Sequence, residues 1–68
     1  MKQITGKELA KAIQRRGWQL FRVKGSHHIF LKDGRRERIV IPIHGSQPLK
    51  IGLLHALMKI ADLNEDEI

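Results

Sequence analysis

A chain of 68 residues with no cysteine and a formal net charge of +6 has room for one small domain only. A domain of this size buries roughly 60% of its unfolded surface, so we expect one thin core and a shallow binding site. The lack of cysteine excludes a disulfide framework and a thiolate metal site, and the lack of an apolar leader or a long apolar run predicts a cytoplasmic protein without membrane contact.

The first predicted element is a short amphipathic helix with a basic outer side. Thr5 and Glu8 have the spacing of a capping box, in which each side chain bonds the other residue's backbone N–H, so the helix should begin near residue 6. Leu9 and Ile13 then recur at helical spacing. Gly17 is placed to end the helix in a left-handed conformation.

Three strands should follow. Residues 18–24 are bulky or β-branched and lack helical periodicity, so they predict a strand that ends at the Gly-Ser pair of 25–26. Residues 27–32 predict a second strand, which leads into the Asp-Gly turn signal at 33–34. Residues 37–43 alternate in apolar character and predict a third strand. Its proline, which cannot donate to a ladder, indicates a sheet edge.

Apolar residues at helical spacing predict a second helix over about residues 49–61, and Asn64 with Glu67 can cap one further turn. The expected fold is therefore α+β in the order α-β-β-β-α. Both helices should cover one face of a three-stranded antiparallel sheet, and the other face should be open to water.

The chain ends in an acidic tail at about residues 62–68, which holds four of the seven acids. Residues 1–61 hold all 13 Lys and Arg and three acids, a net charge of +10. Such an excess favours a polyanionic partner, because neutralising phosphates releases counterions. A basic domain that is merely soluble is the alternative.

Several short motifs follow one another along the chain. In order they are Trp18 after Gly17, Lys24-Gly25-Ser26-His27, the Asp33-Gly34 turn, Pro42-x-His44-Gly45, and Leu49-Lys50-x-Gly52 before an apolar helix ending Ile60-Ala61-x-Leu63. Taken together, these motifs resemble the HicA (YcfA-like) family of mRNA interferase toxins. The resemblance covers nearly the whole chain, and we expect residues 1–68 to form a single domain. One departure is Asp62, where the family more often has Gly.

The resemblance implies a fold similar to the double-stranded-RNA-binding domain and the toxin of a type II toxin–antitoxin system. It further implies an endoribonuclease that acts on mRNA, needs one histidine and no cofactor, and is inhibited by a HicB-type antitoxin. RNA is cleaved without metal when its 2′-hydroxyl attacks the adjacent phosphorus, helped by a general base, a general acid and nearby cations. Imidazole, with an unperturbed pKa of about 6.5, suits these proton transfers. A non-catalytic RNA-binding module that uses the same basic sheet is the competing function.

The Gly-Ser-His motif points to His27 as the catalytic histidine, with His28 as the alternate. Strand alternation leaves the choice open. If Phe30 faces the core, His28 faces inward and His27 is exposed; if Ile29 and Leu31 face the core, His28 is the exposed one.

The remaining candidates are an accessory histidine and a set of RNA contacts. His44, after the third strand, is the accessory acid/base candidate, whereas His55 is interpreted as flanking the second helix. The predicted RNA-binding residues are Arg22, Lys24, Gly25, Ser26, Lys32, Arg35, Arg36, Arg38 and Lys50. A solvated basic face is the alternative. We predict no metal site, because adjacent histidines on a strand point to opposite faces and most carboxylates lie in the tail.

Overall fold

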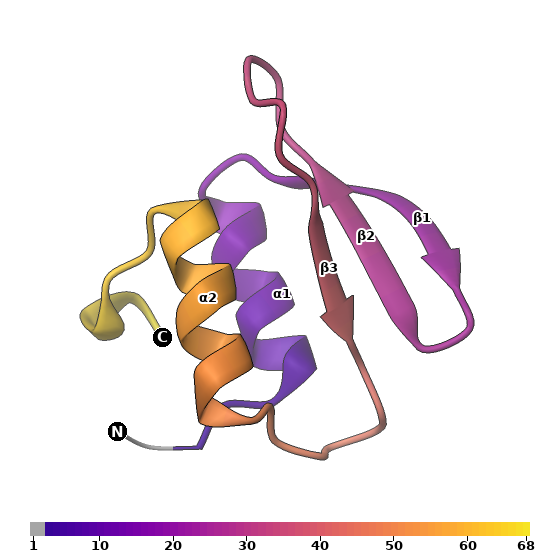
Figure 1. Ribbon diagram of the computed structural model, residues 1–68, viewed down its shortest axis with the longest axis vertical. Coiled ribbons are helices and arrows are strands. Elements are labelled where there is room, and N and C mark those ends of the chain that lie inside the picture. The colour runs from indigo at the N-terminus through magenta and orange to yellow at the C-terminus, as the bar shows by residue number, and fades with distance from the viewer. Residues whose placement is uncertain (1–2) are drawn as a thin grey trace.

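A computed structural model describes residues 3–68 of the chain. Its elements are α1 (Gly6–Arg15), β1 (Gln19–Lys24), β2 (His27–Leu31), β3 (Ile39–Pro42) and α2 (Ile51–Ala61), followed by a 3₁₀ turn over Glu65–Glu67 (Figure 1). The order α-β-β-β-α and the α+β class confirm the prediction from sequence. The arrangement is consistent with a fold like that of the double-stranded-RNA-binding domain.

Local signals fix both ends of α1. The Glu8 carboxylate accepts the Thr5 N–H at 2.9 Å, and the Thr5 hydroxyl accepts the Glu8 N–H at 3.2 Å, which is the predicted capping box. Caps of this kind stabilise a helix by about 1 kcal/mol. At the other end Gly17 has φ +96°, a left-handed conformation that glycine adopts without strain.

The sheet is antiparallel with the strand order β1-β2-β3. Gly25, with φ +60°, and Ser26 form the tight turn from β1 to β2. An added Cβ at Gly25 would have no atom within 4 Å, so a side chain would fit there. Glycine is favoured because of its positive φ, which other residues rarely adopt. β3 is an edge strand, as the position of Pro42 predicted, and the Ile43 N–H extends the ladder by donating to the Ser26 carbonyl at 2.8 Å.

Both helices cover the same face of the sheet. Phe30 on β2 and Ile39 and Ile41 on β3 are buried in one core with residues of the two helices, among them Leu9, Ile13, Leu54, Leu57 and Met58. The helices lie beside β3, and β1 is the strand farthest from them (Figure 1). All six residues of β1 are exposed.

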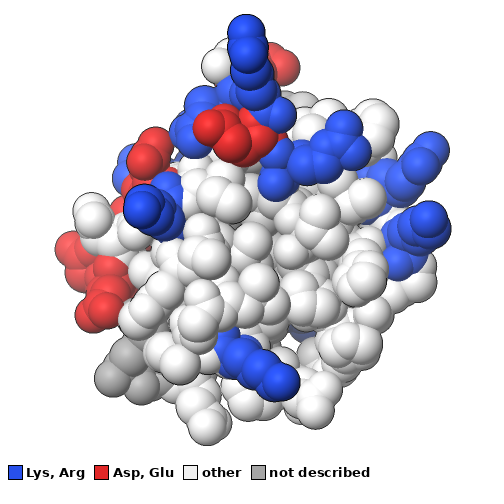
Figure 2. Space-filling model, viewed as in Figure 1, with Lys and Arg blue, Asp and Glu red and all other residues white. Residues whose placement is uncertain are grey.

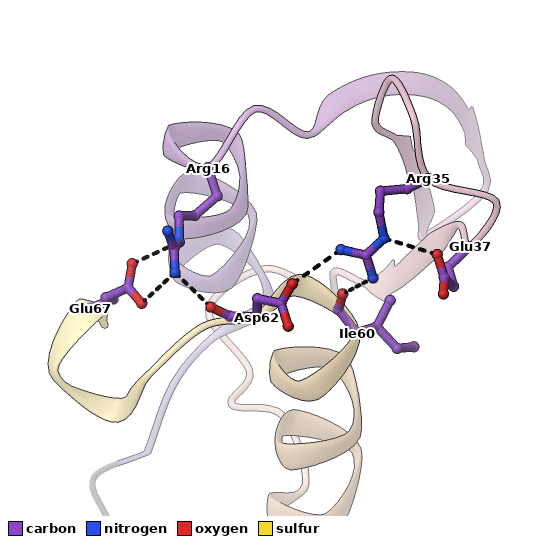
Figure 3. Close-up of polar contacts among 6 residues, drawn as sticks. All are labelled: Arg16, Arg35, Glu37, Ile60, Asp62 and Glu67. Carbon is purple, nitrogen blue, oxygen red and sulfur yellow. Dashed lines mark hydrogen bonds and ion pairs between the residues drawn. The ribbon is translucent and has the colours of Figure 1, made fainter.

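The connection from β2 to β3 is longer than the Asp-Gly signal predicted. A turn does form there, with Gly34 at φ +81° and the Arg35 N–H bonded to the Lys32 carbonyl. β3, however, begins at Ile39 and not at residue 37. Within the longer loop the Arg35 side chain reaches toward the end of α2 (Figure 3).

The acidic tail is tied to the helices. Asp62 ends α2 with φ 57°, a left-handed conformation that explains why glycine suits this position. Arg16 bonds the Asp62 carbonyl at 2.7 Å and pairs with the Glu67 carboxylate at 2.9 Å (Figure 3). Asn64 and Glu67 form the predicted capping box of the final turn. The tail is therefore a packed end of the domain.

Candidate functional site

The two adjacent histidines of β2 lie on opposite faces of the sheet. His28 is paired across the strands with Ile41 and shares the face of the buried Phe30. It is half-buried, and its Nδ1 lies 3.2 Å from the Ser26 carbonyl oxygen, to which a protonated Nδ1 donates. His27 is exposed on the open face. Of the two alternatives that the alternation left open, the structure has the one in which Phe30 faces the core.

His27 is the middle residue of a row that crosses all three strands. Its cross-strand partners are Lys24 on β1 and Pro42 on β3. Side chains directly opposite one another on a sheet are close neighbours on the same face. The imidazole therefore stands between an ammonium group on one side and an apolar ring on the other.

A second row lies beside the first on the open face. Ile29 is paired with Arg22 on β1 and with Val40 on β3. Both rows thus carry a cation on β1 and an apolar side chain on β3. The open face is basic along one edge and apolar along the other, an arrangement suited to a ligand with phosphates on one side and flat, less polar rings on the other.

The sheet edge also exposes apolar side chains that the sequence did not predict. Leu20 is 48%, Phe21 59% and Val23 50% exposed. Leu20 and Val23 pair with Phe30 and His28, so they point to the helix side, but β1 extends beyond the cover of the helices. The pairing register of β1 shifts between Leu20 and Arg22, which places a β-bulge at Phe21. No sequence signal distinguishes such a strand from a covered one.

The other predicted basic residues are dispersed. Arg36 and Arg38 are exposed on the loop of residues 32–38, and Lys32 lies half-buried with its Cε near Gly17. Figure 2 shows basic side chains at the top, around this loop, and at the right, on the side of β1. Acidic side chains lie among the basic ones at the top and also gather at the left. The predicted RNA-binding residues are therefore spread from this loop to the open face.

Arg35 is occupied by contacts within the protein. Its guanidinium donates to the Ile60 carbonyl at 2.8 Å and pairs with the carboxylates of Glu37 at 3.0 Å and Asp62 at 3.2 Å (Figure 3). The hydrogen bond to Glu37 raises the pKa of Arg35. The pKa of Glu37 is lowered by a hydrogen bond from its own backbone N–H and by the Arg35 guanidinium.

His44 and Lys50 lie together at the far end of β3. His44 comes directly after Ile43, whose N–H bonds the Ser26 carbonyl, so it follows the strand at the level of the β1–β2 turn. Both His44 and Lys50 line a hollow of about 270 Å³ between the end of β3 and the start of α2. His55 is exposed on α2 and does not line this hollow.

Metal ligands do not gather anywhere in residues 3–68: no three His, Asp or Glu side chains there are grouped so that they could hold an ion. The same range contains no helix with the length and apolar character needed to cross a membrane. The candidate functional site consists of three neighbouring parts: the open face of the sheet, the β1–β2 turn and the hollow beside the end of β3.

Comparison with known proteins places this architecture in a family. No curated protein matches the chain. A family model described as the HicA toxin of bacterial toxin–antitoxin systems matches residues 6–63. The match begins at the first residue of α1 and ends at Leu63, so it includes both helices, the whole sheet and the His27 row. The chain therefore belongs to the HicA toxin family of bacterial toxin–antitoxin systems, and that membership implies an antitoxin partner.

Proposed function

We propose that this protein is a metal-independent endoribonuclease, an mRNA interferase, that uses His27 as a general acid/base and is inhibited by a HicB-type antitoxin. One observation carries the proposal: His27 is exposed on the open face between Lys24 and Pro42, whereas His28 faces the core. Membership of the HicA toxin family supports the toxin role and the antitoxin partner.

The chemistry follows from this placement. The 2′-hydroxyl of RNA attacks the adjacent phosphorus; a bond forms from O2′ to phosphorus, the bond from phosphorus to O5′ breaks, and a cyclic phosphate and a 5′-hydroxyl remain. His27 handles one of the two proton transfers, for which an exposed imidazole is well suited. Lys24, its cross-strand neighbour, stabilises the charge that develops on the phosphate oxygens. His44 is the accessory candidate for the second transfer.

Binding of the RNA backbone is assigned to the basic groups that surround this row. On the open face these groups are Arg22 and Lys24. The loop of residues 32–38 adds Arg36 and Arg38, and Lys50 lies beyond the end of β3. The open space beside Gly25 leaves room for a phosphate to approach the turn that it forms with Ser26. Lys32 lies at the base of the loop. Arg35 contributes by fixing the loop, because its guanidinium is held by Ile60, Asp62 and Glu37.

The test compares the two histidines in the absence of metal. Purified protein is incubated with labelled single-stranded RNA in excess EDTA, and single-turnover cleavage is measured. We expect His27→Ala to lower the rate about 100-fold or more, the usual effect of losing a general acid or base. His28→Ala should keep a rate much closer to that of the unchanged protein while unfolding at a lower denaturant concentration, because it removes a half-buried ring.

Two results would contradict the proposal. One is full activity in a folded His27→Ala variant; the other is cleavage by the unchanged protein that EDTA abolishes. RNA binding without any cleavage would support the alternative, a non-catalytic RNA-binding module on the same open face. Inhibition is tested by adding a purified HicB-type antitoxin in excess, which should stop cleavage.

A further inference from the structure

A hollow of about 270 Å³ lies between the end of β3 and the first turn of α2. Its apolar lining consists of Pro42, Pro48, Leu49 and Leu53. The volume is slightly below that of sites for drug-sized ligands, which hold about 300–1,000 Å³. A hollow of this size suits one small flat ring system better than a larger ligand.

The polar groups around the hollow are neutral or basic. Gln47 brings an amide that both donates and accepts, and Lys50 and His44 bring nitrogen atoms. None of the residues that line it is acidic. The Gln47 N–H bonds the His44 carbonyl at 3.0 Å, which closes a turn within the loop that forms the hollow. The Leu49 N–H bonds the Ile4 carbonyl at 2.7 Å, which ties the end of this loop to the segment before α1.

The hollow adjoins the proposed catalytic row. Pro42, which lines it, is the cross-strand partner of His27. Directly opposed residues on antiparallel strands have Cβ atoms about 4.5–5.5 Å apart. A ligand that touches the Pro42 ring from within the hollow is therefore close to the imidazole of His27.

We propose that this hollow holds one unstacked base of the RNA substrate, next to the phosphodiester that reaches His27. The inference rests on the proposed function for the identity of the ligand. The rings of Pro42 and Pro48 and the side chain of Leu53 offer apolar surface to the base, the Gln47 amide bonds an edge of it, and Lys50 pairs with a flanking phosphate. Single-stranded RNA fits this site because its bases are free to leave the stack.

The chemistry of the lining also favours a nucleotide over an apolar protein side chain as the occupant of the hollow. An apolar side chain of a protein would gain nothing from Lys50 or from the amide of Gln47. A nucleotide uses both, because it combines a ring that has polar edges with an anionic phosphate. The hollow is thus predicted to give the enzyme a preference for the base beside the scissile bond.

The experiment is a titration of ¹⁵N-labelled full-length protein with AMP, GMP, CMP and UMP, followed by NMR, with inorganic phosphate in a parallel titration. We expect the nucleotides to shift the amide signals of Gln47, Lys50 and Leu53 more than phosphate does, and the four bases to differ in affinity. Leu53 is 38% exposed, so Leu53→Glu should still fold. That variant should bind the preferred nucleotide about tenfold more weakly, the loss expected for one apolar contact.

Ile51→Glu is the matched control. Ile51 lies in the same turn of α2 and is 53% exposed, but it does not line the hollow, so the variant adds the same charge outside the site. Equal weakening by both variants, or identical shifts with phosphate and nucleotides, would overturn the proposal. If Leu53→Glu does not fold, Gln47→Ala on the exposed loop replaces it.

The titration also separates this proposal from the proposed function, because nucleotide binding is measured without cleavage. A protein that binds nucleotides in the hollow but cleaves no RNA would refute the proposed function and still support the base-binding site.

Discussion

The guanidinium of Arg35 lies over the indole of Trp18, 5.5 Å from the centre of the ring. The same group donates to the Ile60 carbonyl, one of the last in α2 and without a partner further along the helix. Trp18 is buried just before β1, in the connection from α1, and Ile60 belongs to the last turn of α2. One side chain of the loop of residues 32–38 therefore joins this connection to the end of α2.

We expect Arg35→Ala to lower the urea midpoint of unfolding clearly more than Arg36→Ala does. Arg36 is the exposed neighbour on the same loop and serves as the control, since surface changes of this kind usually stay within about 0.5 kcal/mol. Arg35→Lys should behave like Arg35→Ala, because an ammonium group cannot bond several oxygens in a fixed fork while it stacks on a ring. Equal midpoints for the alanine variants at positions 35 and 36 would show that the contacts contribute nothing.

Elements whose signals are local could be predicted from the sequence. The capping box of Thr5 and Glu8, the left-handed Gly17 and the apolar alternation of β3 each depend on residues a few positions apart, and each is present in the structure. The role of Arg35 could not be predicted in this way. Its bond to Ile60 spans 25 positions and its bond to Asp62 spans 27, so the loop alone gives no sign of either.

The residues of the candidate site could be predicted from the sequence, but the face of the sheet on which each histidine lies could not. Phe30 and Ile29 are both large and apolar, so alternation alone cannot decide which of them faces the core. The decision is made by the helices, which bury Phe30 against Ile39 and thereby leave His27 on the open face. The exposed side chains of β1 escaped prediction for the same reason, because the extent of helix cover is a property of the whole fold.

Part of the stability that the protein loses on acidification should come from Glu37. Its folded-state pKa is depressed, so its contribution is present above the pKa of the unfolded state and is lost as the pH falls through the folded-state value. Glu37→Gln should therefore be less stable than the unchanged protein near neutral pH, and the two should converge on acidification. Urea midpoints measured from about pH 7 down to about pH 3 test this. Parallel curves over the whole range would contradict it, and Glu65→Gln, for which the fold provides no ion pair in the described residues, is the control.

Two helical glycines should respond in opposite ways to alanine. Gly52 lies in α2 with nothing within 4 Å of an added Cβ, so Gly52→Ala should raise the free energy of unfolding by about 0.5 kcal/mol through helix propensity. At Gly6 an added Cβ would stand 2.7 Å from the Pro42 carbonyl oxygen, so Gly6→Ala should lower it by about 1–3 kcal/mol. Urea denaturation of both variants decides the point. A stable Gly6→Ala would mean that α1 can move away from β3 at little cost.

Lys24 should contribute one phosphate contact to RNA binding. It pairs across the strands with His27, so a phosphate at the imidazole is also within reach of its ammonium group. A 2′-O-methyl oligoribonucleotide, which lacks the attacking hydroxyl, allows binding to be measured without cleavage. Loss of one contact to a single strand reduces the slope of log K against log salt by about 0.7, and we expect this for Lys24→Ala.

Lys11→Ala provides the matched control for this measurement. Lys11 is exposed on α1, which lies on the opposite side of the sheet from His27, so its removal changes the net charge equally without touching the proposed site. An unchanged slope is expected for it. If both variants reduce the slope by the same amount, the RNA is held by the overall charge of the domain. A reduction confined to Lys24→Ala would instead place a phosphate beside His27, where the proposed cleavage requires it.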